Sequence, residues 1–455
     1  MKLGVLILAA GQGTRMKSDT PKVLHEIAGK PMLAHVIETA QQLNPAKIVV
    51  IYGHGGEQVR QQLSSYEVEW ALQEQQLGTG HAVVQGMPAL DSVDKVLVLY
   101  GDVPLIQADT LQQLIDASME TSIGMLTVRV EEPHGYGRIV RDEFDRIIRI
   151  VEHKDASADE LTINEINAGI MAMDQPELSA WLEALNNDNV QNEYYLTDVI
   201  DMAVNDGHVV ASVHPHMPEE VEGVNDRVQL AKMERIMQRQ QAQQLMLDGV
   251  TLMDPERLDI RGSVRAEEDV TIDINVVLEG EIKIGRGGCI GANSVLKNCS
   301  IGENVTILQN CVIEDAEIGS NCTIGPFARI RPGTVLNDDC HIGNFVELKN
   351  AQVDCGSKIN HLSYVGDTTV GRNVNIGAGV ITCNYDGAYK HRTVIGDNVF
   401  LGSDTQLVAP VTVEPGATIG AGSTITRDAP ADQLTLSRSK QISKSGWKRP
   451  LKEKS

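Results

Sequence analysis

A glycine-rich segment with two nearby cations follows the first apolar run of the chain. Gly11 and Gly13 lie in this segment, and Arg15 and Lys22 come shortly after them. Glycines allow a backbone to approach an anion closely, and paired cations suit a triphosphate whose negative charge grows on the leaving group. The segment is not a P-loop, since Gly-Lys-Ser/Thr is absent, nor a dinucleotide fingerprint, since Met16 occupies the third glycine position. It therefore predicts a nucleotide phosphate site of a different kind.

Polar side chains interrupt the apolar pattern of the second half of the chain, and His361 is the most informative of them. An imidazole titrates near neutral pH and can act as a general base, although a single surface histidine is usually only solvated. Glu347 lies 14 residues before His361, and Asn375 lies 14 residues after it. Both fall within one coil of about 18 residues of a hexapeptide solenoid, so all three side chains can face one groove. The spacing therefore predicts base-assisted chemistry.

The first half of the chain alternates strand-like and helix-like runs up to about residue 225. This alternation is typical of a largely parallel sheet covered on both faces, with ligands at the carboxyl edge of its strands. It predicts an α/β, Rossmann-like domain. We expect strands at Gly4–Ala10, Ile48–Tyr52, Val96–Tyr100 and Ile123–Val128, and helices at Met32–Leu43, Gln58–Leu63, His81–Met87 and Thr110–Ser118.

Aliphatic residues in the last 200 positions recur at every sixth place, and many are followed by glycine. An unbroken run of this register comprises Ile395, Leu401, Leu407, Val413, Ile419 and Ile425. The period is typical of a parallel β-helix, in which each sixth side chain points inward and the small residue after it lets the chain turn tightly. The segment Thr382–Thr393 breaks the period, so it is predicted to bulge out as a functional loop.

The stretch between Asp226 and Gly249 contains neither glycine nor proline. Asp226 is a good helix cap and Gly249 a good stop, so the stretch predicts a linking helix. The expected domains are a pyrophosphorylase-like domain at 1–225, a linker helix at 226–250, a β-helix domain at 251–437 and a basic tail at 438–455.

The composition places the chain among globular proteins, with 42% hydrophobic and 22% charged residues in 455 positions. A formal charge of −23 argues against partners such as nucleic acid and anionic membranes. No stretch is long and apolar enough to span a bilayer, so we expect a cytoplasmic protein. All seven cysteines lie in the second half, and none is paired as C-x-x-C. We interpret them as small apolar fillers.

The segments Leu8–Gly11, Gly13–Met16 and Pro21–Lys22 together resemble the signature of sugar-nucleotide pyrophosphorylases. Further matches lie at Gln73, Gln76–Ala82, Tyr100–Pro104, Gly135–Arg138, Val151–Lys154, Asn167–Gly169 and Glu222–Asn225. With the hexapeptide half included, nearly all 455 residues resemble the bacterial bifunctional N-acetylglucosamine-1-phosphate uridyltransferase/glucosamine-1-phosphate acetyltransferase family. The resemblance implies a Rossmann-like nucleotidyltransferase domain followed by a left-handed parallel β-helix of hexapeptide repeats.

For the first half, the resemblance implies that UTP reacts with N-acetylglucosamine 1-phosphate and releases pyrophosphate. Asp102 and Asn225 would hold Mg²⁺, which prefers oxygen ligands shared with phosphates, whereas alone they read as a turn aspartate and a helix cap. Arg15 and Lys22 would neutralise the triphosphate, and catalysis would consist of positioning and charge stabilisation. The implied UTP and UDP-sugar contacts are Leu8, Ala9, Ala10, Gly11, Lys22, Gln73, Gly78, Thr79, Tyr100, Gly101, Asp102, Gly137, Glu152, Asn167 and Asn225.

For the second half, the resemblance implies that the amine of glucosamine 1-phosphate attacks acetyl-CoA in a groove between subunits of a homotrimer. His361 would be the base, and Glu347 would orient or polarise it. The implied sugar-phosphate contacts are Arg331, Lys349, Tyr364, Asn375 and Lys390, and the implied acetyl-CoA contacts are Ala378, Asn384, Tyr385, Ser403, Ala421 and Arg438. The product would feed peptidoglycan and lipopolysaccharide precursor synthesis, and so cell shape.

Three alternatives remain open at this point. One is a pyrophosphorylase with a single activity, whose β-helix only regulates or assembles the protein. Another is a trimeric scaffold without catalysis. A third concerns mechanism, because Cys383 lies beside Asn384 and an acyl-cysteine intermediate is conceivable. Direct attack by an amine needs no acyl-enzyme, so we expect Cys383 to be dispensable.

Overall fold

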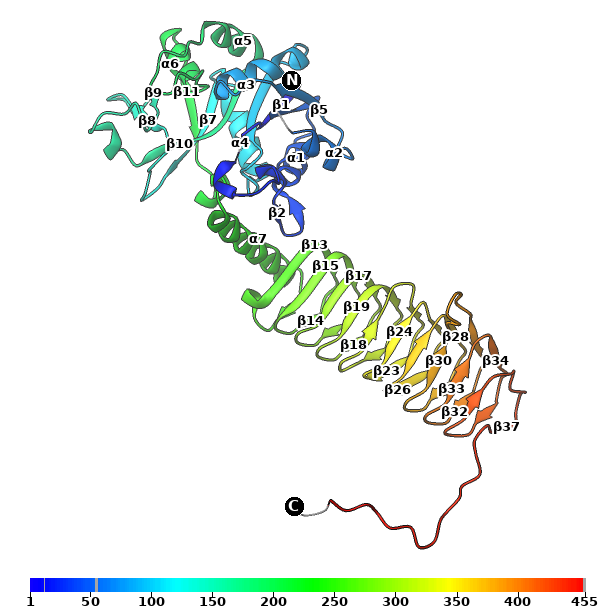
Figure 1. Ribbon diagram of the computed structural model, residues 1–455. Coiled ribbons are helices and arrows are strands. Elements are labelled where there is room, and N and C mark those ends of the chain that lie inside the picture. The colour runs from blue at the N-terminus through cyan, green and yellow to red at the C-terminus, as the bar shows by residue number, and fades with distance from the viewer. Residues whose placement is uncertain (12, 54–55, 453–455) are drawn as a thin grey trace. The chain divides into compact units, whose positions relative to one another are not determined.

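The computed structural model describes residues 1–11, 13–53 and 56–452 (Figure 1). The chain folds as two compact units, Met1–Met237 and a second unit from Gln238 onward. The division falls inside helix α7 (Arg227–Leu247). Asp226 caps this helix, because its Oδ1 accepts hydrogen bonds from the amides of Val228 and Gln229, both at 2.9 Å. No helix of the described residues is long and apolar enough to cross a membrane.

The first unit is built on one nine-stranded sheet with the main strand order β11-β7-β10-β6-β1-β4-β5. Strands β6, β1, β4 and β5 are mutually parallel, whereas β10 runs antiparallel to both β6 and β7. The strands are β1 (Leu3–Ala9), β4 (Lys47–Gly53), β5 (Glu69–Gln73), β6 (Lys95–Tyr100), β7 (Ile123–Arg129), β8 (Arg138–Arg141), β9 (Ile147–Val151), β10 (Glu165–Asp174) and β11 (Val210–Val213), and a separate hairpin comprises β2 (Glu26–Ile27) and β3 (Lys30–Pro31).

Helices cover both faces of this sheet (Figure 1). They are α1 (Met32–Gln42), α2 (Glu57–Gln62), α3 (Thr79–Gly86), α4 (Ala108–Ser118), α5 (Gln175–Ala184) and α6 (Asp198–Asn205). Apolar side chains of α1 and α4 share one core with Val5 and Ile7 of β1, whereas those of α3, α5 and α6 share another with Leu6 and Leu8. The four predicted strands and four predicted helices are confirmed to within two residues at each end.

The second unit is a parallel β-helix made of three rows of short strands (Figure 1). The first row consists of β12 (Thr251–Leu252), β14 (Thr271–Ile272), β16 (Cys289–Ile290), β18 (Thr306–Ile307), β20 (Thr323–Ile324), β23 (His341–Asn344), β26 (Lys358–His361), β29 (Asn375–Ile376), β32 (Phe400–Leu401), β35 (Thr418–Ile419) and β37 (Leu434–Thr435). Every pair of neighbours in this row is parallel.

The other two rows belong to one sheet that begins with long strands and divides after β19. The long strands are β13 (Leu258–Ala266), β15 (Val276–Ile284), β17 (Val295–Ile301) and β19 (Val312–Ile318). One branch consists of β22 (Val335–Leu336), β25 (Gln352–Val353), β28 (Thr368–Val370), β31 (Thr393–Ile395) and β34 (Val411–Val413). The other consists of β21 (Arg329–Ile330), β24 (Glu347–Lys349), β27 (Tyr364–Gly366), β30 (Ile381–Cys383), β33 (Gln406–Val408) and β36 (Thr424–Ile425). The six residues of the unbroken hexad register are all buried, which confirms their inward orientation.

Gly325, which follows the inward Ile324, has φ +100° as a tight turn would require, but other glycines after inward residues have a different role from the predicted one. Gly302 and Gly402 do not have positive φ angles, so neither is required by a left-handed turn. A Cβ on Gly302 would lie 2.8 Å from a backbone atom of the next coil, and one on Gly402 would lie 2.4 Å from such an atom. These positions are therefore glycine because the next coil leaves no room for a side chain.

Left-handed residues do occur in the β-helix, but at other corners. Asn298, Asp315, Asn350 and Asp367 have φ angles between 45° and 49°. Asparagine and aspartate tolerate this region because their short polar side chains can hydrogen-bond locally. The side chains of consecutive coils meet at this corner, since Asn298 Nδ2 donates to Asp315 Oδ1 at 3.0 Å and Asn350 Nδ2 to Asp367 Oδ1 at 2.7 Å.

Cysteines are present as free thiols throughout the β-helix. Cys299, Cys311, Cys322 and Cys340 are buried in its core, which agrees with their interpretation as apolar fillers, but Cys289 is exposed. Burial raises the pKa of the Cys383 thiol, which disfavours the nucleophilic thiolate that an acyl-cysteine route would need.

Candidate active sites

A cavity of about 310 Å³ opens at the carboxyl ends of β1 and β6 in the first unit. Its lining includes ten of the residues predicted to contact the nucleotide, namely Leu8, Ala9, Ala10, Gly11, Lys22, Gln73, Gly78, Thr79, Tyr100 and Asp102. Gln76 and Glu193 also line the cavity. Gly101 is adjacent, because its amide donates to the carbonyl of Leu8 at 2.9 Å. This placement at the carboxyl edge of parallel strands is the usual place for ligands in an α/β sheet.

Two glycines of this region are required by its geometry. Gly13 has φ +60°, and a Cβ there would lie 2.6 Å from the Cβ of Lys22. Gly78 has φ +110°, and a Cβ there would lie 2.5 Å from the carbonyl oxygen of Tyr194. The first glycine thus lets the loop approach Lys22, and the second lets helix α3 begin beside Gln73, whose Nε2 donates to the Gly78 carbonyl at 3.1 Å.

The predicted phosphate-binding cations contact the predicted metal ligands. The Lys22 ammonium donates to Asp102 Oδ2 and, at 3.3 Å, to Asn225 Oδ1, and Arg15 Nη2 donates to the same Asn225 oxygen at 2.9 Å. Asn225 comes within reach because the amide of Val224 donates to the Asp102 carbonyl at 2.9 Å. The carboxylate oxygen of Asp102 and the amide oxygen of Asn225 therefore converge on the ammonium of Lys22.

The predicted sugar contacts form a second cluster, in which Gly137 directly precedes β8, Glu152 directly follows β9 and Asn167 lies in β10. The amide of Asn167 donates to the Gly137 carbonyl at 2.9 Å, and a Cβ on Gly137 would lie 3.5 Å from Glu152 Oε1. Glu152 Oε1 also accepts from Thr197 Oγ1 at 3.0 Å. Burial raises the pKa of Glu152, and burial followed by the charges of Glu152 and Asp102 raises that of Tyr100.

His361 lies at the end of strand β26 in the second unit, where its Nδ1 is 2.9 Å from Asn344 Oδ1. The side-chain amide oxygen of Asn344 can only accept, so Nδ1 of His361 carries the proton when the contact forms, and Nε2 is left as the basic atom. Glu347 contacts Arg331 instead, through an ion pair of 2.7 Å. Within the chain, then, the partner of His361 is Asn344.

Two predicted phosphate-binding lysines lie close together near the inserted loop. The neighbouring ammonium of Lys349 lowers the pKa of Lys390, because like charges disfavour one another. The loop that carries Lys390 is held by a bridge between Tyr385 and Lys390 and by Asp386, whose Oδ2 lies 2.7 Å from His391 Nε2. An anion placed between the two lysines would relieve their repulsion.

Tyr364 and Asn384 lie beside these lysines. Asn384 is buried, and its Nδ2 donates to Tyr364 Oη at 3.4 Å and to Asp367 Oδ2 at 2.5 Å. Tyr385 is exposed, and its hydroxyl donates to the Gly387 carbonyl at 2.6 Å. Asn375 is half-buried at the start of β29, where it pairs with Lys358 and Phe400 of the adjacent coils.

The predicted CoA contacts follow one corner of the β-helix from coil to coil. The Ala378 carbonyl accepts from the amide of Asp404, the neighbour of Ser403, at 2.7 Å. The Ser403 carbonyl accepts from Gly422, the neighbour of Ala421, at 2.8 Å. Arg438 Nη1 donates to the Ala421 carbonyl at 2.9 Å, so the first residue of the basic tail lies at the end of this series.

Sequence reasoning missed Asn344 and Asp367, although a signal for both was present. Each lies 17 residues before its partner, His361 and Asn384 respectively, and 17 is the offset that aligns neighbouring strands here. Glu347 and Asn375, which lie 14 residues before and after His361, are not aligned with it in register. Among the described residues, no group of three or more His, Cys, Asp or Glu side chains could hold a metal ion by itself.

Comparisons with known proteins agree with this two-part arrangement. Residues 5–158 match the MobA-like NTP transferase domain, residues 260–353 the GMPPB C-terminal domain, and residues 392–427 the bacterial transferase hexapeptide with six repeats. Proteins called "Bifunctional protein GlmU" are similar over 99% of both chains, at 56% identity in Ralstonia nicotianae, 56% in Cupriavidus pinatubonensis and 54% in Ralstonia pickettii.

Proposed function

This chain belongs to the family of bifunctional GlmU proteins, and on that premise we propose that it makes UDP-N-acetylglucosamine in two transfers. The second unit acetylates glucosamine 1-phosphate with acetyl-CoA, and the first unit joins the product to UMP from UTP. The similarity to bifunctional relatives over 99% of the chain carries this proposal, since it spans both groups of polar residues. We assign the uridyltransferase to 1–225, the linker helix to 226–250, the acetyltransferase to 251–437 and the basic tail to 438–455.

In acetyl transfer, the sugar amine attacks the thioester carbonyl carbon, the carbon–sulfur bond breaks, and CoA leaves as the thiol. His361 accepts the proton that the amine loses, through the ring nitrogen opposite its contact with Asn344. Lys349, Lys390 and Arg331 bind the sugar phosphate, and the ion pair with Glu347 orients the Arg331 guanidinium. Tyr364 and Asn375 bind the sugar, and Asn384 and Tyr385 lie where the acetyl end meets the sugar amine. The corner from Ala378 to Arg438 binds the rest of CoA.

In uridylyl transfer, a phosphate oxygen of N-acetylglucosamine 1-phosphate attacks the α-phosphorus of UTP, and the bond to the β-phosphate oxygen breaks. Pyrophosphate leaves with the electron pair. Arg15 and Lys22 stabilise the charge that develops on it, and no protein nucleophile takes part. Gln73, Gly78 and Thr79 hold the nucleoside, and Gly137, Glu152 and Asn167 hold the sugar.

Mg²⁺ fits the cluster at Asp102. The Lys22 ammonium contacts Asp102 Oδ2 and Asn225 Oδ1 together, so a cation already occupies the point where the two oxygens converge. Carboxylate and amide oxygens suit this hard metal, which usually takes few protein ligands and shares phosphate oxygens. When bound there, Mg²⁺ would neutralise charge on the triphosphate. Asp102 and Asn225 would hold it, while Lys22 moves to the phosphates.

We further assign the protein to the cytoplasm as a homotrimer. A small-molecule pathway that uses UTP and acetyl-CoA operates in that compartment. His361 and Tyr385 are exposed on the β-helix, so a neighbouring copy can complete the site there. Neither nucleic acid nor a membrane is required by this chemistry.

An omission experiment tests the proposal directly. The full-length protein is incubated with glucosamine 1-phosphate, acetyl-CoA, UTP and Mg²⁺, and each component is left out in turn. We expect thiol release to require only the first two, and pyrophosphate release to require all four. Pyrophosphate release from added N-acetylglucosamine 1-phosphate without any thiol release from glucosamine 1-phosphate would show a pyrophosphorylase with a single activity.

A further inference from the structure

Asp367 lies in the second unit between two asparagine side chains. Its Oδ1 accepts from Asn350 Nδ2 at 2.7 Å, and its Oδ2 accepts from Asn384 Nδ2 at 2.5 Å. Asp367 is half-buried, whereas Asn384 is buried. Although burial acts in the opposite direction, the two amides and the nearby charges of Lys349 and Lys390 lower the pKa of Asp367, so this carboxyl group is ionised at neutral pH.

An ionised carboxylate fixes the orientation of the Asn384 amide. A carboxylate can only accept hydrogen bonds, so the amide nitrogen of Asn384 must face Asp367. That nitrogen has two hydrogens, and its second contact, with Tyr364 Oη at 3.4 Å, uses the other one. The nitrogen is then saturated, and no contact within the described part of the chain engages the side-chain oxygen of Asn384. The free atom at this position is therefore an acceptor.

Close packing reinforces this orientation. A Cβ on Gly366 would lie 2.4 Å from Tyr364 Oη and 2.8 Å from Asn384 Nδ2. The absence of a side chain at Gly366 therefore allows the hydroxyl and the amide to meet. The backbone keeps Asp367 beside them, since its amide donates to the Lys349 carbonyl at 2.9 Å.

We propose that Asp367 is a positioning residue for acetyl transfer, because it holds Asn384 so that the free Oδ1 accepts an N–H of the sugar amine. This inference rests on the proposed acetyltransferase function. A neutral amine must direct its lone pair at the thioester carbon, and an acceptor on one N–H helps to fix that direction. Asp367 touches neither substrate, and acts only through Asn384.

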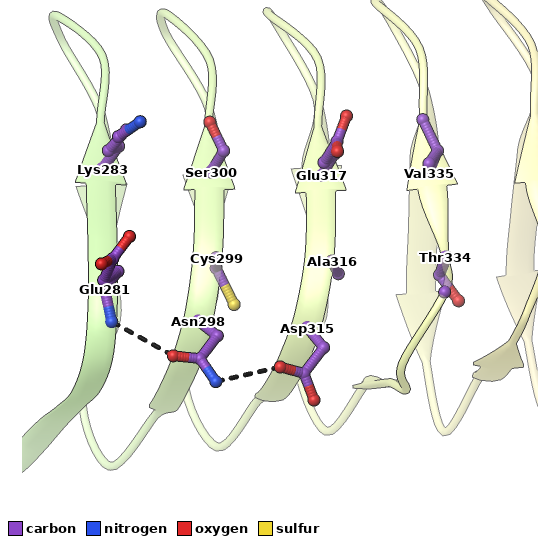
Figure 2. A pocket seen from close by; sticks show the side chains of 11 residues that line it. Glu281, Lys283, Asn298, Cys299, Ser300, Asp315, Ala316, Glu317, Thr334 and Val335 are labelled. Atoms are coloured by element: carbon purple, nitrogen blue, oxygen red, sulfur yellow. Dashed lines mark hydrogen bonds between the residues drawn. The ribbon is translucent and has the colours of Figure 1, made fainter. Parts of the chain in front are cut away.

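The chain contains a matched corner without an active site. Asp315 has φ 45°, close to the 49° of Asp367, and accepts from Asn298 Nδ2 at 3.0 Å. Figure 2 shows this corner in a groove of about 500 Å³ along β15, β17 and β19, which contains none of the predicted site residues. Asn298 Oδ1 there accepts from the amide of Glu281 at 3.1 Å, so this oxygen is engaged by the backbone and is not left as a free acceptor. Asp315 is therefore the natural control for Asp367.

The main test compares D367G with D315G in the full-length protein. Glycine accepts the positive φ angle of both positions, so each variant loses a carboxylate without backbone strain. We expect D367G to lower kcat for acetyl transfer about 10- to 100-fold with KM for glucosamine 1-phosphate unchanged or lower, and D315G to change kcat less than about twofold. If Asp367 were only a counter-charge for Lys349 and Lys390, D367G would lower KM and leave kcat unchanged, which would overturn the proposal.

A double-mutant cycle with N384A tests whether Asp367 acts through Asn384. We expect D367G to lower kcat less than about twofold once Asn384 is alanine, because the group that Asp367 orients is gone. If the fold-losses in kcat caused by D367G and by N384A multiplied in the double variant, the two residues would act independently, which would contradict the proposal. N350A removes only the other partner of Asp367, so it should retain kcat within about threefold. A loss of kcat in N350A as large as that in D367G would show that this corner only supports the fold, which would contradict the proposal.

The conservative variant D367N keeps the test valid if D367G is unstable. Its side-chain oxygen can accept from Asn384, so we expect partial recovery of kcat relative to D367G. D367N and D367G with equal kcat, both as active as D315G, would overturn the inference. If the wild-type protein itself released no thiol from acetyl-CoA and glucosamine 1-phosphate, the proposed function would fail together with this inference. Normal wild-type activity with normal D367G activity would remove the inference alone.

Discussion

The two candidate sites arrange their cations in opposite ways. In the first unit, Lys22 and Arg15 already contact the oxygens of Asp102 and Asn225, so the cations are satisfied before any substrate arrives. In the second unit, Lys349 and Lys390 lie side by side, and the neighbouring Lys349 lowers the pKa of Lys390. The first arrangement must exchange partners on binding, whereas the second gains directly from an anion. Under the proposed function, a lysine and a metal compete for the same oxygens at the first site, whereas the second site is prepared for a phosphate.

The sharpest way to separate the two sites is to remove one essential group from each. We expect D102A to reduce uridylyl transfer by about 10³-fold or more and to leave acetyl transfer intact, since it removes the carboxylate of the proposed metal site. H361A should do the reverse, with acetyl transfer reduced about 10²- to 10⁴-fold. Pyrophosphate and thiol release are measured on the same sample. Parallel loss of both activities in either variant would point to misfolding.

The lysine pair can be tested through substrate affinity. We expect K390A to raise KM for glucosamine 1-phosphate about tenfold and to leave KM for acetyl-CoA unchanged, because one of the three proposed phosphate-binding charges is lost. K358A is a suitable control, since Lys358 is an exposed lysine of the same β-helix. An equal rise in KM for acetyl-CoA would place Lys390 at the cofactor instead.

Competition between Lys22 and the metal can be tested without turnover. We expect K22A to bind Mn²⁺, used as a probe for Mg²⁺, about 3- to 10-fold more tightly than the wild type in the absence of nucleotide, since the ammonium no longer occupies the oxygens. Electron paramagnetic resonance titration measures free Mn²⁺ directly. K2A removes an exposed lysine and should have no effect. Weaker binding by K22A would refute the exchange of partners described above.

The smallest expected effect concerns Asp198 in the acidic region near Glu152. Burial, followed by the charges of Glu152, Asp201 and Asp155, raises the pKa of Asp198 from 3.8 to about 6. Folding then favours the protonated form, so stability falls as pH rises from about 4 to 6 and stays lower above that window. We expect D198N to raise Tm by about 2–4 °C at pH 8, with a gain that disappears near pH 4.

The control for this prediction is D188N, because Asp188 is an exposed aspartate of the same unit. It should leave Tm nearly unchanged at both pH values. A gain for D198N that is the same at pH 4 and pH 8 would mean that the effect is not electrostatic.

Local pattern alone was enough to predict the architecture. The hexad register identified the residues that fill the β-helix, and the alternation of apolar runs located β1, β4, β6 and β7. The glycine loop and its two cations also follow from the sequence, because phosphate binding needs free backbone and positive charge close together in the chain. Strand β10 was not predicted, since its antiparallel place between β6 and β7 depends on pairing with distant strands.

Which residues point inward and which segments carry charge can be read from the amino-acid sequence, because both depend on neighbours within one helical turn or one hexad. Which side chains meet is known only from the folded chain, as for His361 with Asn344, Glu347 with Arg331 and Asn384 with Asp367. Those contacts join neighbouring coils, whose alignment is set by the length of each turn and by the insertion at Thr382–Thr393. The crowding that requires glycine at Gly302 has the same origin, since the next coil exists as a neighbour only after folding.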